Sequence, residues 1–151
     1  MPDFDTALEA IAVSSNATRD FTLTGVHVNC DQPVVIVTKH AGFTNSALTS
    51  AQLKSFNERQ QRGGGNKMSV DKLDADRIGD CKLFAAHVVT TLKNVCEADG
   101  APSKVDKALV ESFLLSLSKR RLDIFRGYTS FASDADNFTE SPHSDPEPLG
   151  K

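Results

Sequence analysis

Residues 21–38 read FTLTGVHVNCDQPVVIVT, and this stretch decides the fold class. Apolar and polar residues alternate over its first four positions, as expected for a strand with one buried face. The alternation resumes out of phase after Gly25, which predicts a β-bulge at the glycine. Residues 29–33 form a polar turn that ends in proline, and residues 34–38 are a β-branched run typical of strands. The stretch therefore predicts an N-terminal β-hairpin or small antiparallel sheet.

Apolar residues recur at helical spacing on both sides of this hairpin. We expect helices over residues 4–13, from Thr49 or Ser50 to about Gln61, from Ser69 or Asp71 to about Ala98, and from Ser103 through about Ala132 with a break at Lys119-Arg120-Arg121. The positions expected to face inward are Phe4, Leu8, Ile11, Leu53, Phe56, Ile78, Cys81, Ala85, Val88, Val89, Leu92, Val95, Cys96, Val105, Leu109, Val110, Phe113, Leu114 and Leu117.

The link Asp99-Gly100-Ala101-Pro102 is short, so the helices on either side of it are expected to be antiparallel neighbours. Ser103 is expected to cap the second of these helices, because Asp106 supplies an acidic residue three positions later. The predicted fold class is therefore α+β, in which an antiparallel helical bundle follows the hairpin.

The sequence predicts one domain over residues 1–138. Within it, a flexible glycine-rich loop is expected near residues 60–68, around Gly63-Gly64-Gly65, because consecutive glycines bury nothing. Residues 139–151 hold three prolines, several acids and almost no apolar side chain. Such a segment cannot offset the entropy of ordering, so a disordered tail is expected there.

The composition argues against two classes of partner. The chain has 151 residues and a formal net charge of −3, without a long basic run. Binding to nucleic acid needs clustered Lys and Arg, because phosphate contacts dominate the affinity. No apolar stretch approaches the ~20 residues that cross a bilayer. Neither a nucleic acid nor a membrane is expected as a partner, and a homo-oligomer is left open.

No group of residues in the sequence forms a convincing catalytic, metal or cofactor site. His27 and Cys30 are three residues apart but lack a second pair of zinc ligands. The acids of residues 71–80 crowd the start of an expected helix, where they complement its dipole. Cys81 and Cys96 complete an odd set of thiols without a Cys-x-x-Cys pair, as expected of free cysteines. We predict a protein that is not an enzyme and needs no cofactor; a small hydrolase or metal-dependent enzyme is the least favoured alternative.

Aromatic residues are concentrated in the last quarter of the chain. Phe125, Tyr128 and Phe131 recur at helical spacing, and Phe138 follows in an expected loop. Aromatic residues with this spacing usually pack in a core. A hairpin and a few helices offer limited shelter, however, so an exposed apolar strip of these four residues is the predicted surface for a protein partner.

Residues 77–138 combine several soft motifs in a fixed order. Val88-Val89 and Asn94-Val95 lie in the first expected helix, residues 97–102 (EADGAP) form the link, and Phe113-Leu114 lies in the second helix. The stretch closes with residues 131–138, which read FASDADNF. In this order and composition the chain resembles the tail assembly chaperones of long-tailed bacteriophages, whose strands-first, helices-after layout also suits the predicted hairpin.

The resemblance implies a function without covalent chemistry. Such a protein would bind the tape-measure protein, keep that long helical chain soluble and help to recruit tail-tube subunits, in the host cytoplasm during phage assembly. The sequence Leu149-Gly150-Lys151 can be encoded by a slippery run of bases, as expected for a short form and a frameshifted long form. A structural virion component, such as a head–tail connector or minor tail subunit, is the main alternative, and it would remain in mature particles.

Overall fold

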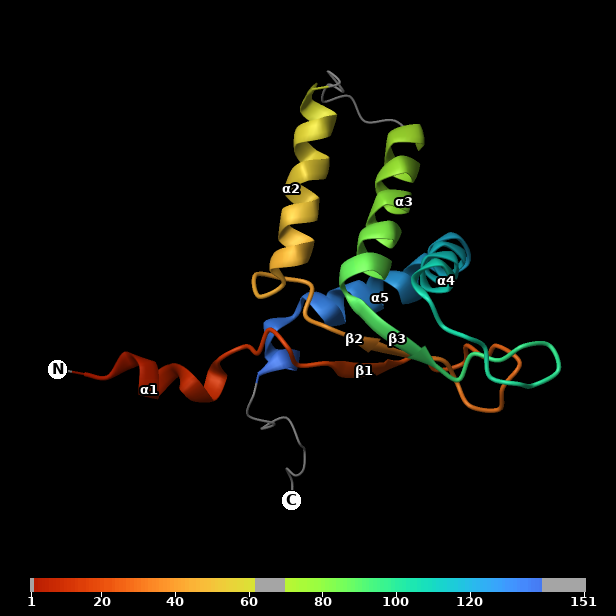
Figure 1. Cartoon of the computed structure of the whole chain (residues 1–151), viewed down its shortest axis with the longest axis horizontal. Helices are drawn as coiled ribbons and strands as arrows, with labels where there is room; N and C mark the ends of the chain where they lie inside the picture. Colours follow the sequence, from red (N-terminus) through yellow and green to blue (C-terminus); the bar gives the residue numbers. More distant parts are fainter. Residues whose placement is uncertain (1, 62–69, 140–151) are drawn as a thin grey trace.

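Three antiparallel strands, in the order β1-β2-β3, form the sheet of this protein. The computed structural model describes residues 2–61 and 70–139 (Figure 1). The predicted hairpin is confirmed, because β1 and β2 pair with Arg19 opposite Thr38 and Thr22 opposite Val35. The mixed α+β class is confirmed as well. The elements are α1 (Phe4–Leu8), the 3-10 helix η1 (Glu9–Ile11), β1 (Arg19–Thr22), β2 (Val35–Thr38), α2 (Ser46–Gln61), α3 (Val70–His87), β3 (Val89–Lys93), α4 (Lys107–Arg120), α5 (Leu122–Ser133) and the 3-10 helix η2 (Ala135–Phe138).

A tight turn interrupts the hairpin where the bulge was predicted. The Leu23 amide donates to the Val34 carbonyl at 2.8 Å, and the Val34 amide donates to the Val26 carbonyl at 2.9 Å. Between these pairings the Val26 amide donates to the Leu23 carbonyl at 2.9 Å and closes a turn. Gly25 lies in this turn with a φ of 87°, a conformation that favours glycine. The predicted single-residue bulge is thus a two-residue turn, after which pairing with Val34 continues.

The expectation of one helix up to Ala98 is wrong, because α3 ends at His87 and β3 follows directly. The Val88 amide closes the last helical hydrogen bond at 3.0 Å. Its carbonyl, by contrast, accepts from the Lys39 amide just after β2, at 2.9 Å. Residues 88–91 are all β-branched, and such side chains lose more freedom in a helix than on a sheet. The third strand therefore lies within the stretch that was expected to be helical.

Residues 94–106 connect β3 to α4. In this connection the Ser103 hydroxyl donates to the Glu97 carboxylate at 2.6 Å. The predicted cap at Ser103 is wrong, because the Asp106 carboxylate accepts from the Leu109 amide at 2.9 Å and is the N-cap of α4. Although a strand separates them in sequence, α3 and α4 still pack against each other.

The core lies between the sheet and the helices α3, α4 and α5, where α4 packs against both α3 and α5 (Figure 1). Val105, Leu109 and Phe113 are only partly buried against this core. The buried residues of the core cluster are Leu23, Val34, Ile36, Leu48, Cys81, Phe84, Ala85, Val88, Val89, Leu92, Val110, Leu114, Leu117, Phe125, Tyr128 and Ala132.

The helices α2 and α3 project together from the sheet as an antiparallel pair, which we call the arm (Figure 1). α2 begins at Ser46, earlier than predicted, because the Asn45 side-chain oxygen accepts from the Leu48 amide at 3.0 Å and caps the helix. At the foot of the arm, Leu48 and Cys81 are buried in the core. Farther out, α2 and α3 pack against each other, and the Arg77 guanidinium of α3 donates to the Ser118 hydroxyl of α4 at 3.0 Å.

Residues 13–14, just after α1 and η1, meet residues 138–139 beside β1. Val13 forms an antiparallel bridge with Thr139, and the Ser14 amide donates to the Phe138 carbonyl at 3.0 Å. The Arg19 guanidinium donates to the Thr139 carbonyl at 2.8 Å. Thr139, one residue past the predicted limit of the domain, is buried. The expected glycine loop and the rest of the expected tail fall in residues 62–69 and 140–151, outside the described residues.

Candidate interaction surface

The four aromatic residues predicted to contact a partner belong to the core region. Phe125, Tyr128 and Phe138 are buried, and Phe131 is half-buried. The prediction that they form an exposed strip is therefore wrong, and the alternative of a core role holds for them. The physical reason is that α5 lies on the sheet and turns this apolar face toward it.

An aromatic cluster joins β1, α5 and η2. The Phe21 ring lies 5.7 Å from that of Tyr128 and 5.1 Å from that of Phe131, measured between centroids. The Phe131 ring in turn lies 6.1 Å from that of Phe138. Tilted and edge-on contacts at these distances stabilise a core beyond the burial of area. The aromatic density near the C-terminus is thus used to attach three elements to one another.

A buried hydrogen bond ties α5 to β2. The Tyr128 hydroxyl lies 2.8 Å from Thr38 Oγ1, and both side chains are fully buried. The Thr38 hydroxyl donates to the Lys39 carbonyl at 2.9 Å, so the Tyr128 hydroxyl is the donor of the pair. Burial raises the pKa of Tyr128 strongly, although the hydrogen bond to Thr38 acts in the opposite direction.

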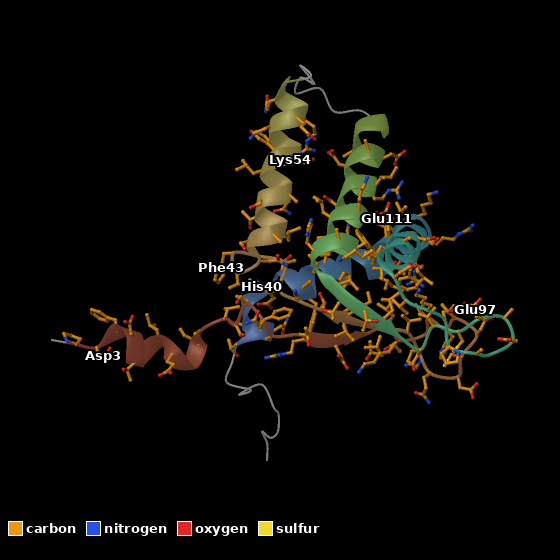
Figure 2. The ribbon with its side chains drawn as sticks, viewed as in Figure 1. Asp3, His40, Phe43, Lys54, Glu97 and Glu111 are labelled. Carbon is orange, nitrogen blue, oxygen red and sulfur yellow. The ribbon has the colours of Figure 1, made fainter. Side chains whose placement is uncertain are left out.

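His40 is a buried polar side chain whose position the sequence did not reveal. Its Nδ1 lies 2.9 Å from the Thr44 hydroxyl, and its ring lies 5.3 Å from the rings of both Phe43 and Phe138. Figure 2 shows His40 and Phe43 close together at the foot of α2. An added Cβ at Gly42 would lie 2.6 Å from the His40 ring, which explains a glycine at that position. This cluster fixes the loop between β2 and the arm.

The largest exposed apolar side chains of the arm lie on both of its helices. Leu53 and Phe56 on α2 are 59% and 49% exposed, and Leu73 and Ile78 on α3 are also exposed. The predictions that Leu53, Phe56 and Ile78 face inward are therefore wrong. Their helical spacing is real, but the described part of the chain leaves each of these side chains exposed.

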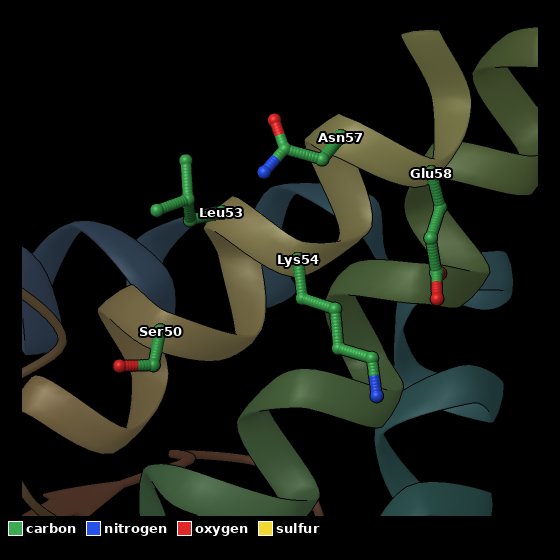
Figure 3. Close-up of a pocket in the computed structure, with 5 residues that line it drawn as sticks. All are labelled: Ser50, Leu53, Lys54, Asn57 and Glu58. Carbon is green, nitrogen blue, oxygen red and sulfur yellow. The ribbon is translucent and has the colours of Figure 1, made fainter. Parts of the chain in front are cut away.

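α2 presents two different faces. On one face, Leu53 and Lys54 line a shallow hollow together with neighbouring polar residues, and Figure 3 shows Leu53 pointing away from the neighbouring helices. The other face looks toward α3 and carries Phe56. The two exposed apolar side chains of α2 therefore belong to different surfaces.

An open groove of about 490 Å³ runs between α2 and α3. Its charged residues are Arg59, Asp76 and Asp80, of which Arg59 and Asp76 form an ion pair at 2.9 Å. Desolvation by the surrounding chain, followed by the charge of Asp76, raises the pKa of Asp80. The groove is lined by Gln52, Ser55, Phe56, Arg59, Ala75, Asp76, Gly79, Asp80 and Leu83.

α1 and η1 carry a second exposed apolar stripe. Phe4, Leu8 and Ile11 share one face as predicted, but all three are exposed and none faces inward as expected. The Asp3 carboxylate caps α1 by accepting from the Thr6 amide at 3.1 Å, and this bonding to Thr6 lowers the pKa of Asp3. The stripe is flanked by acidic residues, which limits the partners that it suits.

The cysteine and histidine positions give no metal centre in the described part of the chain, where no three His, Cys, Asp or Glu side chains are grouped to hold an ion. His27 contacts the Cys30 backbone carbonyl at 3.2 Å. All three cysteines are free thiols. Cys96 follows β3, so the expectation that it shares a helix with Cys81 is wrong. Desolvation, followed by the neighbouring Cys30 thiol, raises the pKa of Cys96.

Comparison with protein-family models, with curated proteins and with solved structures found no match to this chain. None of the helices in the described ranges is long and apolar enough to cross a membrane. The arm combines exposed apolar side chains with an open groove. The sequence contained a signal for this exposed surface. A helix that carries apolar residues on more than one face, with no strand nearby, leaves some of them without a core to pack against.

Proposed function

We propose that this protein is a non-enzymatic tail assembly chaperone of a long-tailed bacteriophage, which binds the tape-measure protein and helps to recruit tail-tube subunits. The observation that carries the proposal is the apolar surface of the arm, where Phe56, Leu73 and Ile78 are exposed on two projecting helices. A chaperone needs surface of this kind, because burial of apolar area is the main source of reversible protein association.

The sequence resemblance over residues 77–138 supports the identity of the partner. Part of it, residues 88–95, lies in and beside β3 and not in a helix. The proposal therefore draws on the order and type of the residues, and not on a shared helical layout. The exposed arm adds a physical reason for binding that the resemblance alone does not give.

Co-expression with the tape-measure protein of the same phage tests the proposal. The soluble fraction of the tape-measure protein should rise, and the two proteins should leave a size-exclusion column together. An unrelated protein of similar size and charge is the control. Equal solubility with and without this chain would refute the chaperone function. Recovery of this chain in purified mature particles would favour a structural virion component.

A further inference from the structure

We propose that the groove between α2 and α3 receives an amphipathic helix of the partner, with apolar side chains on Phe56 and Leu83 and a basic side chain beside Asp80. This inference rests on the proposed function, because it names the part of the chain that would hold a long helical protein. A pair of helices with an open apolar groove is a common receptor for a third helix, whose side chains at every third or fourth position fill the groove.

The groove has open space for the apolar side chains of such a helix. Phe56 enters it from α2 and is 49% exposed, while Leu83 is half-buried near its foot. On the α3 side the lining residues Ala75 and Gly79 are small, which lets another backbone approach closely. A Cβ placed on Gly79 would meet no atom within 4 Å, so the space beside this glycine is open.

The charges of the groove favour a basic occupant. Asp76 and Asp80 face a single cation among the described lining residues, and Arg59 already pairs with Asp76 at 2.9 Å. No side chain in the described ranges donates a hydrogen bond to the Asp80 carboxylate. Partial desolvation and the charge of Asp76 raise the pKa of Asp80 and Arg59 lowers it, while the Asp80 side chain stays exposed in the groove. A Lys or Arg of a bound helix would supply a second cation for this pair of carboxylates.

The apolar stripe of this chain's own α1 is a poorer occupant. Phe4, Leu8 and Ile11 have the spacing of a helix that fills a groove, but Asp3, Asp5 and Glu9 surround them. Residues 140–151 carry Glu140, Asp145 and Glu147 and a single leucine. Two arms placed groove to groove would bring together two sites that each carry two carboxylates and one guanidinium. Each of these arrangements sets acid against acid, so a basic helix from another protein fits best.

A direct binding experiment on the full-length protein tests the groove. The probe is a fluorescein-labelled synthetic helix with Leu at every third and fourth position and Lys at the flanking positions; a twin peptide carries Glu in place of Lys. Fluorescence anisotropy should show binding of the Lys peptide that weakens with added salt, and no binding of the Glu twin. Asp80→Lys should weaken binding of the Lys peptide about tenfold.

Gly79→Leu is the decisive variant. A Cβ at this position would meet no atom within 4 Å, and leucine is a better helix former than glycine, so the new side chain should occupy the groove and the fold should be retained. We expect at least a roughly tenfold loss of binding, as for blocking the centre of an interface. Leu53→Ser is the control. Leu53 is exposed to an extent similar to that of Phe56, but it lies on the other face of α2, outside the groove. Circular dichroism verifies the folding of each variant.

Several results would overturn the proposal: binding by Gly79→Leu that equals the wild type, an equal loss in Leu53→Ser, or preference for the Glu twin. A dimer that Gly79→Leu dissociates, without peptide binding, would assign the groove to a second copy. Solubilisation of the tape-measure protein by Gly79→Leu as well as by the wild type would refute the groove and leave the chaperone function standing. Groove-dependent peptide binding without any effect on the tape-measure protein would refute the function and leave the groove standing.

Discussion

Replacing Tyr128 by Phe removes one oxygen atom from the centre of the molecule. Tyr128 is the only tyrosine of the chain, its side chain is fully buried, and its hydroxyl donates to Thr38 Oγ1 at 2.8 Å. In the variant, Thr38 keeps its own bond to the Lys39 carbonyl but loses the donor from α5. Loss of one partner of a buried hydrogen bond lowers the free energy of unfolding by about 1–2 kcal/mol, and we expect a decrease of that size.

A double-mutant cycle isolates the hydrogen bond from the other effects. Thr38→Val removes the acceptor and leaves the phenol buried without a partner, which should cost about 1–3 kcal/mol. Once Tyr128 is Phe, the same Thr38→Val change should cost less, because no buried donor is left behind. The difference between the two costs is the coupling energy, which we expect near 1 kcal/mol for residues in contact.

The pH dependence gives an independent measure of the same burial. The folded protein holds the pKa of Tyr128 well above its ordinary value of 10.0. Tyr128 has its ordinary pKa in the unfolded chain and a higher pKa in the folded protein. At a pH between these two pKa values, the unfolded chain has lost a proton that the folded protein keeps. The contribution of Tyr128 to the free energy of unfolding is therefore complete below about pH 10. It decreases as the pH rises further, by about 1.4 kcal/mol per pH unit. Tyr128→Phe should lack this part of the alkaline decline.

Urea denaturation followed by far-ultraviolet circular dichroism measures the free energy of unfolding of each variant and its dependence on pH. Because the chain has one tyrosine and no tryptophan, near-ultraviolet absorbance reports the ionisation of Tyr128 alone. Two results would refute the reasoning. One is ionisation of the folded wild type near pH 10, as in a free tyrosine. The other is an alkaline decline of equal slope in the wild type and in Tyr128→Phe.

Three further predictions concern α4, the thiols and α5. Asp106→Ala removes the N-cap of α4 and should lower the free energy of unfolding by about 1 kcal/mol in urea; no change would mean that the cap is dispensable. Oxidised glutathione should link the neighbouring thiols of Cys30 and Cys96 and leave Cys81 reduced, as peptide mapping by mass spectrometry would show; a disulfide at Cys81 would contradict its burial. Phe125→Ala should cost about 3–5 kcal/mol, and a variant of unchanged stability would show that Phe125 is not in the core.

The hairpin could be predicted from the sequence because its signals are local. Residues 34–38 are β-branched, and Gly25 marks the irregular turn beside them. The third strand was missed because residues 81–92 satisfy a helical period and a buried strand at the same time. Val88-Val89-Thr90-Thr91 was the signal against a helix, since four β-branched residues in succession favour a sheet. Only the pairing with β2, a tertiary contact, decides between the two.

The candidate surface was less predictable than the fold. Spacing shows which residues share a face, but it does not show whether another element covers that face. For Phe125 and Tyr128 the sheet supplies the cover, and the predicted strip is buried. Leu53 points away from the neighbouring helices and Phe56 lies in the open groove, so these residues, expected inside, are exposed. Both errors have one cause, which is that burial depends on packing between segments far apart in the chain.

The closure of the chain beside β1 has a consequence for synthesis on the ribosome. The Arg19 side chain donates to the carbonyl of Thr139, a residue 120 positions later. This contact can therefore form only after nearly the whole chain has been translated. Until then Val13 and Ser14 also lack the backbone partners that Thr139 and Phe138 supply. A premature stop before Phe138 would remove these partners, and the segment before β1 would lose its attachment to the domain even if all three strands are present.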